Sequence, residues 1–199
     1  MMKTLKILLC TLLVVGVCIG VCSCGDGEAV LDAFKTAITE TAPKTVEGEI
    51  TVYTDFGPLE ATYTTVIADD GSLKIDYTYE KFNLSTEGGE NDTKSEVKGT
   101  VTRDASGTYS ATDSSLAAKI TVDSNSVSLN LDEEKMTYTV QGNVLSAKVL
   151  AADTESVLGV AYDVDVNLVV AMNSSGAIVS YTLDYTPETG RVTVVCNFK

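Results

Sequence analysis

Cysteine is the residue type in this chain with the clearest potential for chemistry, and four of the five cysteines lie within the first 24 residues. Two lysines precede an apolar run over 7–17, which is too short to span a bilayer comfortably. A small residue, Ser23, then precedes Cys24, and a polar Gly-Asp-Gly segment follows. This layout is typical of a secretory signal peptide rather than of a membrane helix. We therefore expect residues 1–23 to be removed.

The Val-Cys-Ser-Cys segment that ends at Cys24 resembles the lipobox of bacterial lipoproteins, whose cysteine is acylated and becomes the first mature residue. Cys18 and Cys22 match less well, because each follows a valine where the lipobox has Gly, Ala or Ser. The resemblance implies an anchor of acyl chains such as palmitate at Cys24, followed by a short tether over 24–27. Two chains, at about 0.8 kcal/mol per buried methylene, hold a protein on a membrane where one chain binds only marginally.

We therefore predict an extracytoplasmic protein attached to a bacterial membrane through a lipidated Cys24. The alternative is an ordinary secreted protein with a cysteine near its cleavage site by chance.

Histidine and tryptophan are absent from the sequence. Without histidine, Ser/His/Asp and Cys/His triads and imidazole-based zinc sites are excluded. Paired carboxylates could act on glycosides, but here they fall at expected turns or on an exposed strand face. They are Asp69 with Asp70, Asp132 to Glu134, and Asp163 with Asp165. The 132–134 acids lack the spacing of an EF-hand calcium loop. We predict no enzyme activity, no catalytic residue, no metal and no cofactor.

The mature chain is strongly acidic. The full chain has 14 basic and 28 acidic residues, and loss of two lysines with the leader leaves 12 basic residues and a net charge of −16. This charge disfavours binding to nucleic acid and lying flat on an anionic lipid surface. The remaining length suits one domain with a substantial core, which we place at 28–199. We expect a monomer.

Cys24 and Cys196 are the cysteines that remain after cleavage, and Cys24 would carry the lipid. No disulfide is then left to form, so the core has to supply the stability. Cys196 alternates in phase with Val192 and Val194, which places it on an apolar strand face. A buried inert thiol is favoured over a nucleophile, since no histidine can activate it.

An amphipathic helix is predicted directly after the tether, over 28–40, and Pro43 stops it. Its apolar side chains recur at the spacing of a single helical stripe. The stripe consists of Ala29, Val30, Ala33, Phe34, Ala37 and Ile38. Such a face must be covered by another part of the chain.

Most of the remaining sequence alternates between apolar and polar side chains, which is typical of strands with one buried face. Short turns such as Asp69-Asp70-Gly71 require neighbouring strands to be antiparallel. The break over 151–158 predicts one or two helical turns. Strands are expected from about 46 and near 60–67, 73–80, 96–103, 107–112, 117–122, 126–131, 136–140, 143–150, 160–170, 177–186 and 191–198.

Nine tyrosines fall on these expected strands. Packing across the sheet is the favoured interpretation, because aromatic side chains pack well between strands. Lining a carbohydrate or lipid groove is the other. They are Tyr53, Tyr63, Tyr77, Tyr79, Tyr109, Tyr138, Tyr162, Tyr181 and Tyr185.

One amphipathic helix followed by a long antiparallel meander is similar to the plan of the lipoprotein-carrier superfamily, which includes the periplasmic lipoprotein carrier of Gram-negative bacteria and the mycobacterial lipid-carrier lipoproteins. The resemblance implies an α+β fold in which a curved antiparallel sheet of about ten strands, an incomplete barrel, packs on the N-terminal helix. Such carriers hold acyl chains between sheet and helices. The chain departs from them in having one good predicted helix, where carriers have more.

The leading functional prediction is a non-enzymatic lipoprotein that binds or carries an apolar or lipid ligand. The wall of its cavity would combine the helix stripe with an apolar strand face, and direct packing of helix on sheet is the competing interpretation of the same residues. The candidate ligand-binding residues are Val30, Phe34, Ile38, Val164, Val166 and Leu168. The alternative function is a surface module that binds a protein or a glycan without a ligand cavity.

Overall fold

The computed structural model describes residues 27–55, 57–83 and 93–199. The predicted signal peptide and Cys24 lie outside these residues. The helical elements are α2 (Gly27–Glu40), α3 (Leu116–Ser126), a 3-10 turn (Ala151–Asp153) and α4 (Thr154–Leu158). The strands are β1 (Thr45–Thr54), β2 (Gly57–Ile67), β3 (Leu73–Asn83), β4 (Thr93–Arg103), β5 (Tyr109–Ala111), β6 (Met136–Gln141), β7 (Val144–Val149), β8 (Val166–Met172), β9 (Ile178–Tyr185) and β10 (Val192–Phe198).

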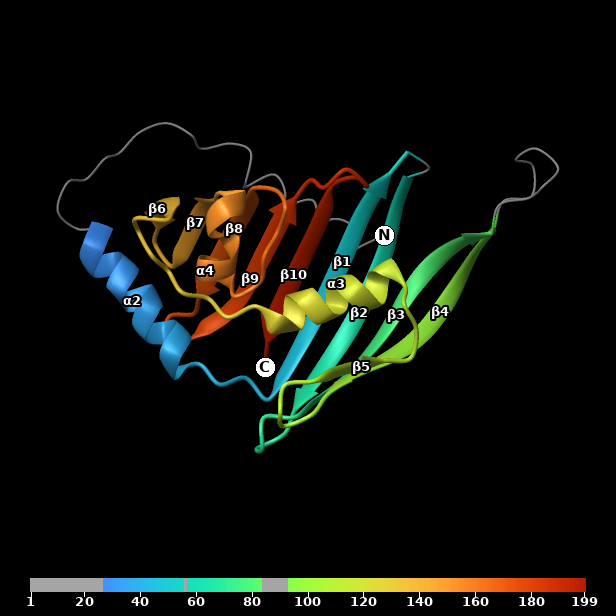
Figure 1. Cartoon of the computed structure of the whole chain (residues 1–199). Coiled ribbons are helices and arrows are strands. Elements are labelled where there is room, and N and C mark those ends of the chain that lie inside the picture. Colours follow the sequence, from blue (N-terminus) through green and yellow to red (C-terminus); the bar gives the residue numbers. More distant parts are fainter. Residues whose placement is uncertain (1–26, 56, 84–92) are drawn as a thin grey trace.

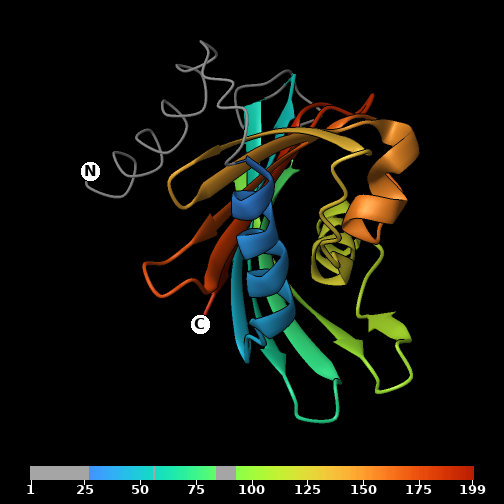
Figure 2. The same cartoon turned by 90° about the vertical axis from the view of Figure 1, so that its left-hand side faces the viewer.

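The described strands form one antiparallel sheet in the order β5-β4-β3-β2-β1-β10-β9-β8-β7-β6. The first and last strands pair in the middle, and β5 and β6 are the two edges, so the sheet is not closed. It curls strongly, with α3 and α4 inside the curve and α2 beside the β6 edge (Figure 1, Figure 2). The predicted α+β fold, a curved antiparallel incomplete barrel packed on an N-terminal helix, is confirmed.

The core fills the inside of this curve. Along each long strand the buried side chains alternate with exposed ones, as in β3, where Leu73, Ile75 and Tyr77 are buried and the residues between them face out. Full burial of such a side chain contributes about 1.5–3 kcal/mol. Among the described residues, no helix has the length and apolar character needed to cross a membrane.

The helix predicted over 28–40 is confirmed as α2, which lies against β6 and β9. Its buried stripe consists of Leu31, Phe34 and Ala37, spaced three residues apart. The Thr41 hydroxyl accepts a hydrogen bond of 3.2 Å from the Ile178 backbone N–H, which fixes the end of the helix to β9.

The strands predicted over 117–122 and 126–131 are wrong, because α3 occupies most of this stretch. Ser115 caps the helix by accepting a hydrogen bond of 3.1 Å from the Ala118 N–H. Near the other end, Ser124, Asn125 and Ser126 donate to backbone carbonyls four residues earlier, so their polar side chains serve the helix. The helix is followed by an extended segment whose Ser128 and Asn130 N–H groups bond to the end of α4.

The strand predicted over 160–170 is also shorter than expected, since β8 begins at Val166. The residues before it bond to the helical break instead. The Thr154 hydroxyl accepts from the Tyr162 N–H at 2.9 Å, and the Asp165 carboxylate accepts from the Ala151 N–H at 3.0 Å. The helical turns predicted over 151–158 are confirmed. The expectation of a single good helix is wrong because of α3.

Candidate functional site on the concave face of the sheet

The six predicted ligand-binding residues all lie in or against the core. Phe34, Val166 and Leu168 are fully buried. Val30, Ile38 and Val164 are half-buried and pack against them. None of the six lines either of the two surface depressions described for the chain. Their part in binding stays a prediction, and their present contacts are those of helix-on-sheet packing.

A row of glycines and tyrosines crosses the neighbouring half of the concave face. In the strand register Gly48 of β1 pairs with Tyr63 of β2, Tyr63 pairs with Tyr77 of β3, and Tyr77 pairs with Gly99 of β4. Each tyrosine ring lies over a glycine. A Cβ atom at Gly48 would come within 1.9 Å of the Tyr63 ring, and one at Gly99 within 2.2 Å of the Tyr77 ring. Only glycine leaves room for the rings at these positions.

Buried polar atoms connect the row to β10 and connect β9 to α3. The Tyr63 hydroxyl lies 2.9 Å from the Cys196 sulfur, and the Tyr181 hydroxyl donates to the Ser124 carbonyl of α3. Burial is the main cause that raises the pKa of both tyrosines well above the usual value, and it raises the pKa of Cys196 to about 11. The thiol therefore stays protonated at neutral pH, and the predicted burial of Cys196 is confirmed.

Helix α3 rests on this tyrosine row, and two of the four side chains that it buries carry hydroxyl groups. The buried residues are Ala118, Ile120, Thr121 and Ser124. The Thr121 hydroxyl is buried and has no hydrogen-bond partner in the described part of the chain. A buried polar group without a partner costs about 1–3 kcal/mol. The contact between α3 and the sheet therefore includes one unfavourable group.

Side-chain hydrogen bonds fasten the C-terminal end of α3. Thr65 of β2 donates to the Asn125 side chain at 2.6 Å, and the Tyr109 hydroxyl donates to the Asn125 carbonyl at 3.3 Å. The Ser126 hydroxyl lies 3.1 Å from the Tyr109 hydroxyl. These contacts around Asn125 and Ser126 form a polar clasp at the C-terminal end of the helix.

An aromatic pair and a carboxylate occupy the region between α3 and β9. The rings of Tyr162 and Tyr185 have centroids 4.8 Å apart. Burial raises the pKa of both, and the charge of Asp123 on α3 raises them further. Burial also raises the pKa of Asp123, against the opposing effect of Lys119. Contrary to the sequence prediction, Tyr162 lies outside the strands.

Sequence reasoning missed Leu31 of α2, the whole of α3 and the tyrosine–glycine row. The row did leave a signal. Gly48 and Gly99 stand inside alternating strand patterns, and an isolated glycine there indicates a close approach of another group. The identity of that group depends on register, which single strands do not reveal.

The chain matches no protein-family model and no curated protein. Among solved structures it is similar to a putative outer membrane lipoprotein-sorting protein domain from Vibrio parahaemolyticus, with 9% identity, a TM-score of 0.28, and coverage of 87% of this chain and 90% of that chain. A porin-like protein from Bacteroides uniformis has 10% identity, a TM-score of 0.27, and coverage of 80% and 98%. The dehydratase domain from the CurK module of curacin polyketide synthase has 7% identity, a TM-score of 0.23, and coverage of 85% and 78%.

These TM-scores are too low to carry a functional argument, so the account of function rests on the chain's own residues.

Proposed function

We propose that this chain is a non-enzymatic extracytoplasmic lipoprotein, held on a bacterial membrane by an acylated Cys24, that binds an apolar ligand on the concave face of its sheet. The observation that supports the ligand proposal is the seat of α3. Two of the four side chains that α3 buries against an apolar sheet face carry hydroxyl groups, and the Thr121 hydroxyl has no partner in the described part of the chain.

Displacement of α3 would expose the Thr121 hydroxyl to water and uncover apolar surface. The strands that carry the tyrosine row also contribute Ile50, Ile75 and Val101, which are at most 2% exposed. At about 25 cal/mol per Å² of buried apolar surface, an acyl chain covering this surface would replace what α3 provides. The clasp at the C-terminal end of α3 would keep the helix attached while its remainder moves.

The membrane tether supports the same proposal. A protein held at a bilayer surface by two acyl chains meets lipid at high effective concentration, so modest intrinsic affinity is sufficient for occupancy. Cys24→Ala should abolish partitioning of the protein into a detergent phase. Partitioning equal to that of the wild type would contradict the anchor.

Native mass spectrometry with organic extraction tests the ligand proposal on the processed chain purified from bacterial membranes. We expect co-purifying lipid, and uptake of a fluorescent fatty acid by protein from which that lipid has been removed. A lipid-free mass together with no uptake of fatty acid or phospholipid would overturn the proposal.

Thr121→Val sharpens this test, because it replaces the partnerless hydroxyl by a methyl group of similar shape. The better seat of α3 should raise thermal stability and weaken fatty-acid uptake. Thr193→Val, a matched change on β10 outside the α3 seat, should leave uptake unchanged. A more stable Thr121→Val protein with normal uptake would show that α3 does not need to move.

A further inference from the structure

The outer face of the sheet, on the side away from the helices, carries a shallow depression of about 580 Å³ over β2, β3 and β4. Its volume falls within the range of about 300–1,000 Å³ that small-molecule sites occupy. Five of its lining side chains are threonines. The outward side chains on the three strands are Thr62, Thr64, Asp76, Thr78, Lys98 and Thr100, and the lining also includes Tyr63, Tyr77, Gly99 and, beside β4, Thr112.

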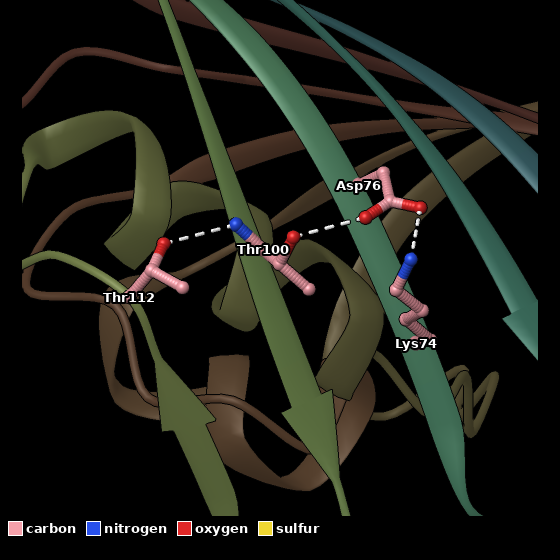
Figure 3. A network of polar contacts seen from close by, with 4 residues as sticks. All are labelled: Lys74, Asp76, Thr100 and Thr112. Atoms are coloured by element: carbon pink, nitrogen blue, oxygen red, sulfur yellow. Dashed lines mark hydrogen bonds and ion pairs between the residues drawn. The ribbon is translucent and has the colours of Figure 1, made fainter.

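Asp76 at the centre of this depression is already engaged (Figure 3). Its carboxylate accepts from the Lys74 ammonium at 2.7 Å and from the Thr100 hydroxyl at 3.0 Å. The Thr112 hydroxyl in turn accepts from the Thr100 backbone N–H at 3.0 Å. These bonds fix the geometry of one wall and neutralise its charge.

The second charged group is compensated as well, since the Lys98 ammonium lies 3.3 Å from the Glu96 carboxylate. The hydroxyls of Thr62, Thr64 and Thr78, by contrast, make no hydrogen bond within the described part of the chain. Each hydroxyl can donate one hydrogen bond and accept two. The depression therefore offers free hydrogen-bonding groups without a net charge.

We propose that this depression binds a neutral oligosaccharide. Neighbouring strands are about 4.8 Å apart, and alternate residues along one strand about 6.8 Å, so Thr62, Thr64 and Thr78 form a flat set of hydroxyls on the length scale of a sugar ring. Sugar hydroxyls can pair with them in either direction, and the threonine methyl groups offer contact to the C–H face of the ring. The paired charges disfavour anionic and cationic ligands alike.

This site is independent of the concave face, because alternating residues of β2 and β3 face opposite sides of the sheet. Tyr63 and Tyr77 point into the core, while Thr62, Thr64 and Thr78 point outwards. Failure of the sugar site would leave the lipid proposal untouched, and the reverse also holds.

The test is threonine-methyl NMR on the processed chain in a zwitterionic detergent free of sugar, titrated with maltotriose, cellotriose and the trimer of N-acetylglucosamine. We expect saturable shifts of the Thr62, Thr64 and Thr78 methyl signals with at least one of them. Exposed threonines on strands can be replaced by valine without loss of strand propensity. The triple change of these residues to valine should weaken binding at least about tenfold, equal to about 1.4 kcal/mol.

The matched control replaces three outward threonines outside the depression, Thr51, Thr182 and Thr193, by valine, and should leave affinity unchanged. Equal weakening in both triple variants would overturn the proposed site. Unchanged methyl signals with all three sugars at about 10 mM would overturn it too. That concentration is about ten times the dissociation constant that corresponds to a binding free energy of about −4 kcal/mol. If the threonine-methyl signals shift with protein concentration in the absence of sugar, the outer face mediates self-association, and the proposed sugar site is overturned.

Discussion

The two longer helices cover the same core in different ways. α2 buries Leu31, Phe34 and Ala37, an apolar stripe without polar atoms in its side chains. α3 buries Thr121 and Ser124 beside Ala118 and Ile120, and hydroxyl and amide hydrogen bonds also hold it. The hydrogen bonds of α3 are only partly shielded in Thr65–Asn125 and buried in Tyr181–Ser124, and each adds only about 0.5–1.5 kcal/mol because it replaces a bond to water. The difference supports the proposal that α2 is part of the permanent core and that α3 is the element able to move.

The largest expected effect follows from truncation of the α2 stripe. Phe34→Ala should destabilise the fold by about 3–5 kcal/mol, the usual cost of removing a fully buried aromatic side chain. Urea denaturation of the processed chain would measure it. Leu116→Ala, at a half-exposed position at the start of α3, is the control and should cost far less. Equal losses in the free energy of unfolding would contradict the distinction between the α2 and α3 contacts with the core.

A smaller effect is expected from filling the glycine positions under the tyrosine rings. Gly99→Ala should cost about 1–3 kcal/mol, because the Tyr77 ring must move away from the new methyl group. In a Tyr77→Leu background the same change should cost less, and the difference is the coupling between the two sites. Additive costs in the double mutant would show that the ring does not rest on the glycine. Thermal or urea denaturation provides the measurement.

The smallest expected effect is electrostatic. Burial raises the pKa of Asp123, so the native state disfavours its charged form and loses stability as pH rises from below about 4 through that raised pKa. Asp123→Asn should therefore be more stable than the wild type at pH 7 and about equal to it in acid, as thermal unfolding at both pH values would show.

Asp113 provides a control of opposite sign. Its pKa is lowered, first of all by the Ser115 hydroxyl, so its contribution is present above the unfolded pKa of about 4 and is lost as pH falls. Asp113→Ala should be less stable than the wild type at pH 7, with a difference that shrinks in acid. The same sign of change in both variants would contradict this account of the α3 surroundings.

Much of the fold could be predicted because it depends on local periodicity. The α2 stripe and most of the alternating strands follow directly from residue spacing. α3 was missed because Ile120 and Val122 alternate with polar residues as in a strand. In the structure the serines and the asparagine that follow bond to helical carbonyls. The segment before β8 was missed for a similar reason. Its residues Tyr162 and Asp165 bond to the helical turns over 151–158 instead of to a neighbouring strand. The tyrosine row required the register of four strands, which no local pattern contains.

Native-state hydrogen exchange of the processed chain, with and without a bound fatty acid, tests the central claim most directly. Amides of α3 should exchange by local opening at a rate clearly faster than those of α2, and their exchange should change when the fatty acid binds, while α2 remains protected to the level of global unfolding. Equal protection of the two helices, unchanged by the fatty acid, would contradict the claim that α3 is the movable cover of the concave face.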